Sequence, residues 1–531
     1  MHARFLMVLV GVLGCQGSIG DSDPLNPINP LPMSVTPGGD PPAEACAQLA
    51  EGAPIPTRRL TAAQLEATVQ DVLGFETEYD TSDETLTGYR ANTTTSVEQE
   101  AANEFMRTSE DISAAVAPRL VELCEGPCAD WILENIAPRL FRRPLSAEVA
   151  TRYRGLYELG FAEGGDVEGV SWLLQGLLQS PRFLYLLEEA GDGGFLDSFA
   201  MAARLSYALW GTAPDVALLE SAAAGNLATP EGIRTESERL IADDRFEEGA
   251  REFVLQWLRL ESLLDESKRA DFFELPGDLR AALLEEPVQL FVHQVRAGST
   301  IAGLIEEPIS VENELLDGMY GEESIRAEEG IRHLDPDRRA GLLTLPGVQA
   351  ALSHAEESAP TVRGFIILDN FLCDKPPPPP VGVTPTLPPN DGTLSTRERL
   401  SIHFEDDTCG GCHRQMDGIG FAFENYDWLG RWRDEDNGEA IDASADFMLS
   451  GHRILADGPV GMSDAIGGRW DVDLCIARQW VIYASAIANT ADAQCLMEDM
   501  ALGSREEGIR EMLLTFVSSD WFRRPFEGAS P

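Results

Sequence analysis

The stretch FEEGAREFVLQW, residues 246–257, sets the character of much of this chain. Its large apolar side chains recur every three or four residues, the period of one helix face: Phe246, Ala250, Phe253, Val254 and Trp257. The same period dominates residues 101–300. The sequence therefore predicts a mainly α fold, in which such apolar stripes form the core rather than a cofactor site.

Helix boundaries elsewhere carry suitable capping residues. Thr61 predicts the start of a helix that Gly74 ends. Thr229 followed by Pro230 predicts another start, because proline is tolerated at the first helical position. The apolar run at 199–210 predicts a helix that is buried on most sides.

Composition and charge limit the classes of function. The 531 residues are 44% hydrophobic and 24% charged, which is typical of globular proteins and suggests three or four domains at roughly 100–200 residues each. There are 89 acidic and 40 basic residues, so the formal charge is −49. Such a chain repels phosphate backbones, and we expect it to bind no nucleic acid.

The N-terminus predicts export. Arg4 precedes a nine-residue apolar run at 5–13, which is too short to span a bilayer and is typical of a signal peptide. The end of this segment, Val12 to Cys15, resembles a bacterial lipobox, in which the cysteine is lipidated after cleavage. Lipid chains on Cys15 would anchor the protein to a membrane. The alternative is an ordinary signal peptide that is cut elsewhere.

Cysteine usage agrees with an oxidising compartment. Of the nine cysteines, three have other predicted roles, and the remaining six can form three disulfides. The expected pairs are Cys124–Cys128, Cys475–Cys495 and Cys46–Cys373. Free buried cysteines are the alternative.

The motif with predicted chemistry is CGGCH, residues 409–413. This CxxCH pattern is typical of c-type haem attachment: Cys409 and Cys412 would add to the two vinyl groups, and His413 would ligate the iron. Such attachment takes place outside the cytoplasm, in agreement with export. Two alternatives stay open. A zinc site would need two further ligands, and no second CxxC follows; a disulfide or redox-active thiol pair would need only the two cysteines.

The sixth iron ligand has several candidates. Met416 is too close to His413 to reach the opposite face of the porphyrin, whereas Met448, His452 and Met462 lie far enough along the chain to fold over it. Met462 is the favoured ligand. The alternative is that all three are structural.

Other patterns concern the organisation of the chain. Five prolines at 376–380 predict an extended spacer. Asn437-Gly438 between short alternating segments predicts a β-hairpin, and residues 470–524 return to a helical pattern. The chain contains no GxSxG elbow, phosphate-binding loop or HExxH motif.

Several motifs, taken in order, resemble those of one protein family. They are RRLT at 58–61, LFRRPL at 140–145, LQSPRFLY at 178–185, RAGLLT at 339–344, the proline run, and the segment from Cys412-His413 through FAFENYD at 421–427 to GRWR at 430–433. The family comprises exported multidomain proteins of planctomycete and myxobacterial type, largely of unknown function, with a cytochrome-c-like CxxCH module. The resemblance implies a mostly helical chain in which Cys409, Cys412 and His413 attach haem.

The expected domains follow from these observations. They are a lipoprotein signal peptide at 1–15, a proline-rich tether at 16–56, an N-terminal helical module at 57–120, a short helical module at 121–165, a central helical domain at 166–335, a cytochrome-like CxxCH module with its spacer at 338–445, and a C-terminal helical module at 460–531.

Two functional hypotheses remain. The first is a lipid-anchored protein of the cell envelope, periplasm or cell surface with one covalent haem c and its iron, which transfers electrons to or from an envelope partner rather than acting as a stand-alone enzyme. The second is a non-redox surface lipoprotein that binds an extracellular polymer or another envelope protein. In that protein, CxxCH would be a disulfide or zinc staple.

Overall fold

The computed structural model describes most of the chain from Arg58 to Arg524. The expected signal peptide, the expected tether, Cys15, Cys46 and residues 379–389 lie outside the described residues. The described ranges are 58–93, 97–264, 276–320, 326–328, 330–378, 390–405, 409–449, 451–488, 490 and 493–524.

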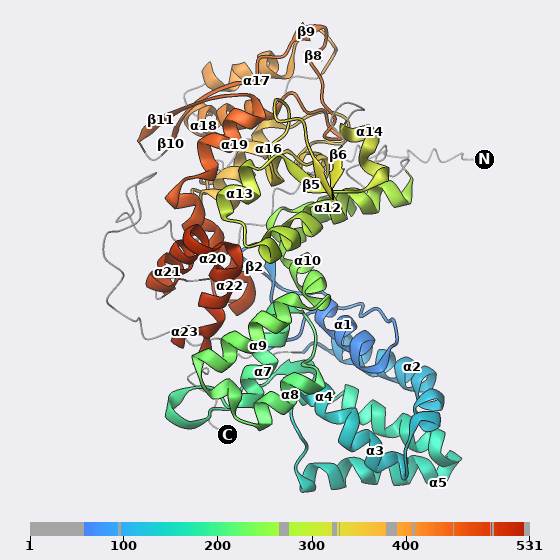
Figure 1. Ribbon diagram of the computed structural model, residues 1–531. Helices are drawn as coiled ribbons and strands as arrows, with labels where there is room; N and C mark the ends of the chain where they lie inside the picture. The colour runs from blue at the N-terminus through green and yellow to red at the C-terminus, as the bar shows by residue number, and fades with distance from the viewer. Residues whose placement is uncertain are drawn as a thin grey trace, which may run out of the picture.

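The fold is mainly α, as the sequence predicts (Figure 1). In the first part of the chain the helices are α1 Ala62–Leu73, α2 Gln99–Leu123, α3 Cys128–Asn135, α4 Ala137–Phe141, α5 Ala147–Leu178 and α6 Pro181–Leu184. In the middle they are α7 Ser198–Leu209, α8 Val216–Ala223, α9 Pro230–Ala242, α10 Arg245–Trp257, α12 Gly277–Ala297, α13 Ile301–Glu306 and α14 Asp317–Tyr320. Toward the C-terminus they are α15 Pro346–Ala351, α16 Pro360–Ile366, α17 Thr396–Glu405, α18 Gly410–Gly420, α19 Gly458–Gly467, α20 Trp470–Ser485, α21 Gln494–Glu507, α22 Ile509–Ser518 and α23 Asp520–Arg523.

Local capping explains where several helices begin. Thr61 forms a capping box with Gln64 at the start of α1, and Gly74 ends this helix in the left-handed conformation. Thr229 caps α9 by accepting a hydrogen bond from the Gly232 N–H. The predicted starts of these two helices are therefore confirmed.

The strands are short and pair in antiparallel fashion. The pairs are β1 (Arg58–Arg59) with β4 (Tyr185–Leu186), β2 (Thr85–Leu86) with β3 (Tyr89–Arg90), β8 (Glu435–Asp436) with β9 (Glu439–Ala440), and β10 (Ser444–Leu449) with β11 (His452–Asp457). A three-stranded sheet has the order β5 (Ile309–Val311), β7 (Ile331–His333), β6 (Arg326–Glu328). The Asn437-Gly438 hairpin is confirmed by β8 and β9, whereas the longer β10–β11 hairpin was not predicted.

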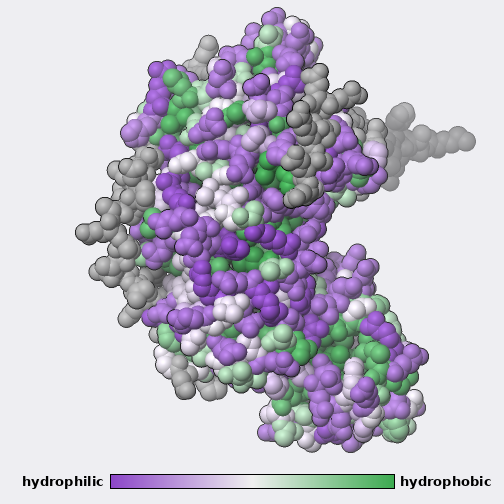
Figure 2. Space-filling model, viewed as in Figure 1, coloured by the Kyte–Doolittle hydropathy of each residue, from purple (hydrophilic) through white to green (hydrophobic). Residues whose placement is uncertain are grey.

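Two hydrophobic cores divide the described residues. The smaller core is built from residues between Leu60 and Leu186, joined by Ala203 and Tyr207. The larger core runs from Leu196 to Phe522, joined by Tyr89. In Figure 1 the helices of the smaller core form the lobe at the lower right. Figure 2 shows that hydrophilic residues cover most of the face turned to the viewer.

Helix α5 is a hairpin rather than one straight helix. Its backbone leaves the helical conformation at Gly164 and Gly165. The two arms touch so closely that a Cβ atom on Gly176 would lie 2.4 Å from Leu156 Cδ1. The expected boundary at residues 165/166 therefore falls at the tip of this hairpin, and the cores divide between Leu186 and Leu196 instead.

The disulfides agree with the predicted pairs only in part. Cys124 is bonded to Cys128, as the intervening turn predicts. Cys475 is bonded to Cys373, across 102 residues of chain and with Cα atoms 5.5 Å apart. This pairing corrects the expected Cys475–Cys495 and Cys46–Cys373 bonds, because the fold of the large core places α20 against the segment that follows α16. Cys495 is disulfide-bonded as well, but not to Cys475.

None of the helices in the described ranges combines the length and apolar character that crossing a bilayer requires.

Candidate functional site

The CxxCH motif forms the first turn of α18. Cys409 is the N-cap residue, and its carbonyl oxygen accepts hydrogen bonds from the backbone N–H groups of Cys412 at 3.3 Å and His413 at 3.1 Å. All three side chains are on partly exposed residues. The structure therefore presents two thiols and an imidazole together at the accessible start of one helix.

The imidazole of His413 is oriented from behind by a buried carboxylate. Its Nδ1 lies 3.0 Å from Oδ2 of Asp417, one helical turn further on. Asp417 is fully buried, and its Oδ1 accepts a hydrogen bond of 2.6 Å from the Thr361 hydroxyl on α16. Because the carboxylate accepts, Nδ1 carries the proton, and Nε2 keeps the lone pair that a metal would bind.

Glycines hold α18 against its neighbours. A Cβ atom on Gly364 of α16 would lie 1.8 Å from the carbonyl oxygen of Met416, and one on Gly420 would lie 1.9 Å from that of Pro360. On another side, the Cβ position of Gly418 is 3.2 Å from Phe447 of β10. The backbones of α16 and α18 are thus in direct contact, which fixes the position of the motif.

The FAFENYD segment at 421–427, which follows α18, has a structural role. Arg363 is fully buried and donates hydrogen bonds to the carbonyl oxygens of Phe423, Tyr426 and Asp427 at 2.7–3.1 Å. Burial lowers the pKa of Arg363 to about 10 despite the nearby Glu424. This guanidinium satisfies backbone groups that would otherwise be buried without partners.

The candidate sixth ligands differ in their exposure to solvent. Met462, on α19, is fully buried within the large core. Met448 is exposed on β10, on the opposite face from the buried Phe447, and His452 is exposed on β11. The role of Met462 as the sixth ligand stays a prediction.

The state of the two cysteines and the surrounding side chains bears on the disulfide and zinc alternatives. In this structure Cys409 and Cys412 are not joined to each other. Across the described ranges, no cluster of three or more His, Cys, Asp or Glu side chains is arranged to hold a metal ion.

Sequence reasoning missed the two residues behind the imidazole. Asp417 follows His413 by four residues, a spacing that places both on one helix face and that could have identified it. Thr361 lies 52 residues before His413, and no local pattern connects the two.

Three segments of the chain match family models. Residues 128–188 match PSD5 (DUF1595), residues 196–321 match PSD4 (DUF1592), and residues 339–436 match PSCyt3 (DUF1588), each described as a protein of unknown function. These are planctomycete-type multidomain families, and the third match contains the CxxCH motif. The gap between the first two matches falls where the two cores divide. No curated protein and no solved structure shows significant similarity to the chain.

Proposed function

We propose that this protein carries one covalently attached c-type haem at Cys409, Cys412 and His413, and that it transfers electrons in the cell envelope. The observation that carries the proposal is the first turn of α18. There, two thiols are followed by an imidazole whose Nδ1 is hydrogen-bonded to Asp417, which favours Nε2 as the metal-binding nitrogen.

The residues present fit the group. Cys409 and Cys412 would form the two thioethers, and His413 would be the axial ligand. When bound, haem supplies one-electron redox chemistry. The protein's own contribution is to orient the imidazole: Thr361 donates to Asp417, and Asp417 accepts from His413. A carboxylate acceptor makes the imidazole a stronger electron donor, which favours a lower reduction potential.

Two further observations support an exported location. The bonds Cys124–Cys128 and Cys373–Cys475 are typical of an oxidising compartment. The signal-like N-terminus and Cys15 would provide export and a lipid anchor to the membrane.

The name of the family model that matches residues 339–436, PSCyt3, also hints at a cytochrome-like module. The strongly acidic chain favours a redox partner with a basic surface.

The test is a haem stain of the full chain on a denaturing gel, after expression in a host proficient in cytochrome maturation. Covalent haem survives denaturation, so we expect a stained band and a Soret absorption in the native protein. Cys412→Ser should lose most of the stain. The matched control, in which Cys124 and Cys128 are both changed to serine, should keep it. A colourless wild-type protein would overturn the proposal, and zinc in that sample would favour the non-redox alternative.

A further inference from the structure

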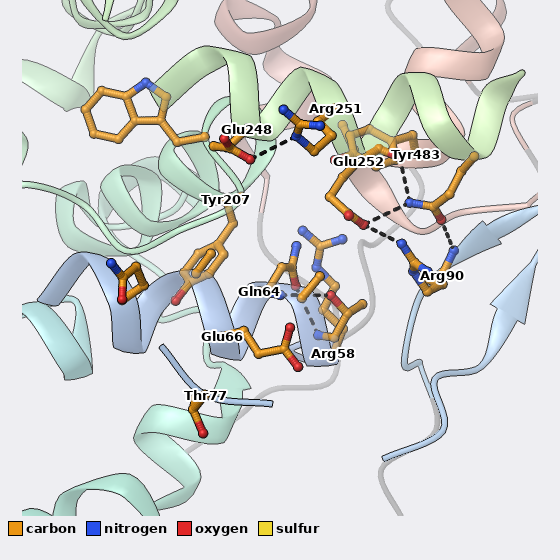
Figure 3. Close-up of a pocket in the computed structure, with 18 of the residues that line it drawn as sticks. Arg58, Gln64, Glu66, Thr77, Arg90, Tyr207, Glu248, Arg251, Glu252 and Tyr483 are labelled. Carbon is orange, nitrogen blue, oxygen red and sulfur yellow. Dashed lines mark hydrogen bonds and ion pairs between the residues drawn. The ribbon is translucent and has the colours of Figure 1, made fainter. Parts of the chain in front are cut away.

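A second site lies away from α18, between the two cores. Here α1 and β3 face α10 and α20 around a cavity of about 290 Å³ (Figure 3). This volume is near the lower end of the range for small-molecule sites, roughly 300–1,000 Å³. The cavity is therefore large enough for a small metabolite and too small for a macromolecular segment.

The cavity is lined by charged groups of both signs, most of which are paired. Arg90 contacts Glu252 at 2.7 Å, and Arg251 contacts Glu248 at 3.1 Å. Glu66 accepts a backbone N–H at 2.8 Å. Arg90 and Arg251 thus neutralise Glu252 and Glu248, whereas Glu66 and Glu76 line the cavity without a cationic partner among the described residues.

Arg58 is the lining arginine that has no carboxylate partner among the described residues. It belongs to β1, is only 7% exposed, and directs its guanidinium into the space between α1 and α10 (Figure 3). Within the ranges that the structure describes, its side chain has no hydrogen bond or ion pair, and its buried Nε has no partner. Burial lowers the pKa of Arg58 below the usual value. An unpaired buried cation is unfavourable, and an anionic ligand would relieve this cost.

The other lining groups restrict the kind of anion. The unpaired guanidinium of Arg58 presents the fork geometry that a carboxylate accepts through two hydrogen bonds. The nearby carboxylates of Glu66, Glu248 and Glu252 would repel a doubly charged phosphate, but they accept hydrogen bonds from hydroxyl groups. The rings of Tyr207 and Tyr483 supply apolar surface for a carbon skeleton.

We propose that this cavity binds a small hydroxycarboxylate, such as a sugar acid, whose carboxylate pairs with Arg58. The hydroxyl groups of the ligand donate to the lining glutamates. This site is independent of the haem proposal, since it uses no residue of α18.

The test is isothermal titration of the full chain with glucuronate, galacturonate and gluconate. We expect at least one of these probes to bind the wild-type protein. Arg58→Gln should weaken that binding roughly tenfold to a hundredfold, the value of a charged hydrogen-bonded pair. Arg58→Lys keeps the charge but loses the two-pronged geometry of the guanidinium. Its affinity for the probe should lie between those of the wild type and Arg58→Gln.

Two controls make the result specific. Arg478 is as buried as Arg58, at 3% exposure, but does not line the cavity, so Arg478→Gln should bind the probe like the wild type. Glucose, which lacks the carboxylate, should not bind. The proposal is overturned if none of the three acids binds, if Arg58→Gln binds them as tightly as the wild type, or if inorganic phosphate binds more tightly. Circular dichroism of each variant shows whether it folds. If Arg58→Gln does not fold, the affinity of Arg58→Lys for the probe tests the proposal, and an affinity equal to that of the wild type overturns it.

Discussion

The start of α18 and the cavity at Arg58 each contain a buried charged side chain, which has partners in the first and none among the described residues in the second. Asp417 is fully buried, and both of its oxygens have partners, Thr361 and His413. Arg58 is almost as buried and has no partner among the described residues. A satisfied network holds a side chain in one orientation, which suits a permanently attached group. An unpaired buried charge can instead form its ion pair with a ligand that binds reversibly.

The largest effect should come from forcing apart the helices that carry the satisfied network. Gly364→Ala places a Cβ atom 1.8 Å from the Met416 carbonyl oxygen, so α16 and α18 must separate. We expect the free energy of unfolding to fall by about 3 kcal/mol, measured by urea denaturation. Gly411→Ala is the matched control, because nothing lies within 4 Å of its Cβ position. Equal stability of both variants would contradict the close contact.

Asp473 sharpens the comparison because it is a buried carboxylate that Arg505 compensates only in part. Burial raises the pKa of Asp473 from 3.8 to about 6, against the opposing effect of Arg505. The folded state therefore binds this proton more tightly than the unfolded state, and stability falls as pH rises from about 4 to about 6.

Replacing Asp473 removes that dependence. Asp473→Asn should stabilise the protein at pH 7 by up to about 3 kcal/mol, two pKa units at about 1.4 kcal/mol each, and should change little near pH 4. Thermal unfolding followed across this pH range checks the prediction. An unchanged pH profile would show that the carboxylate is not penalised by burial.

Asp417→Asn should break the hydrogen-bond network around Asp417, with a smaller loss of stability than Gly364→Ala. An amide cannot accept from both Thr361 and His413 in the same geometry, so one buried donor loses its partner. We expect a loss of about 1–2 kcal/mol in the free energy of unfolding. In a protein that carries the proposed haem, the reduction potential should rise by roughly 60 mV, a tenfold change for a one-electron couple. Asp374→Asn, an exposed change beside the same helix, should alter neither quantity.

The smallest effect should be a stabilisation, opposite in sign to the effect of Asp417→Asn. Without ligand, Arg58→Gln removes an unpaired buried charge, and the free energy of unfolding should rise by about 1 kcal/mol. Thermal unfolding in ligand-free buffer measures it. A large loss of stability would instead mean that Arg58 has a structural partner, and the contrast with Asp417 would disappear.

Local features of this fold were predictable from the sequence. The caps at Thr61 and Thr229 depend on residues three positions away, and the structure has both helices. The turn at Asn437-Gly438 is equally local. For the candidate site, the sequence identified CGGCH, because five consecutive residues carry the whole pattern.

Long-range features were not predictable, because spacing along the chain does not determine contacts across it. The expected partner of Cys475 was 20 residues away, whereas the observed partner lies 102 residues away. Burial of Met462 depends on how α19 packs, which its own sequence does not reveal. That Arg58 has no partner among the described residues depends on what surrounds it in the folded chain.

The bond between Cys373 and Cys475 closes a covalent ring around the whole segment that contains α17, α18 and the β10–β11 hairpin. A single protease cut anywhere inside this ring leaves both fragments attached to the same molecule. On a non-reducing gel such a nicked protein would run as one band, and only a reductant would separate the two fragments.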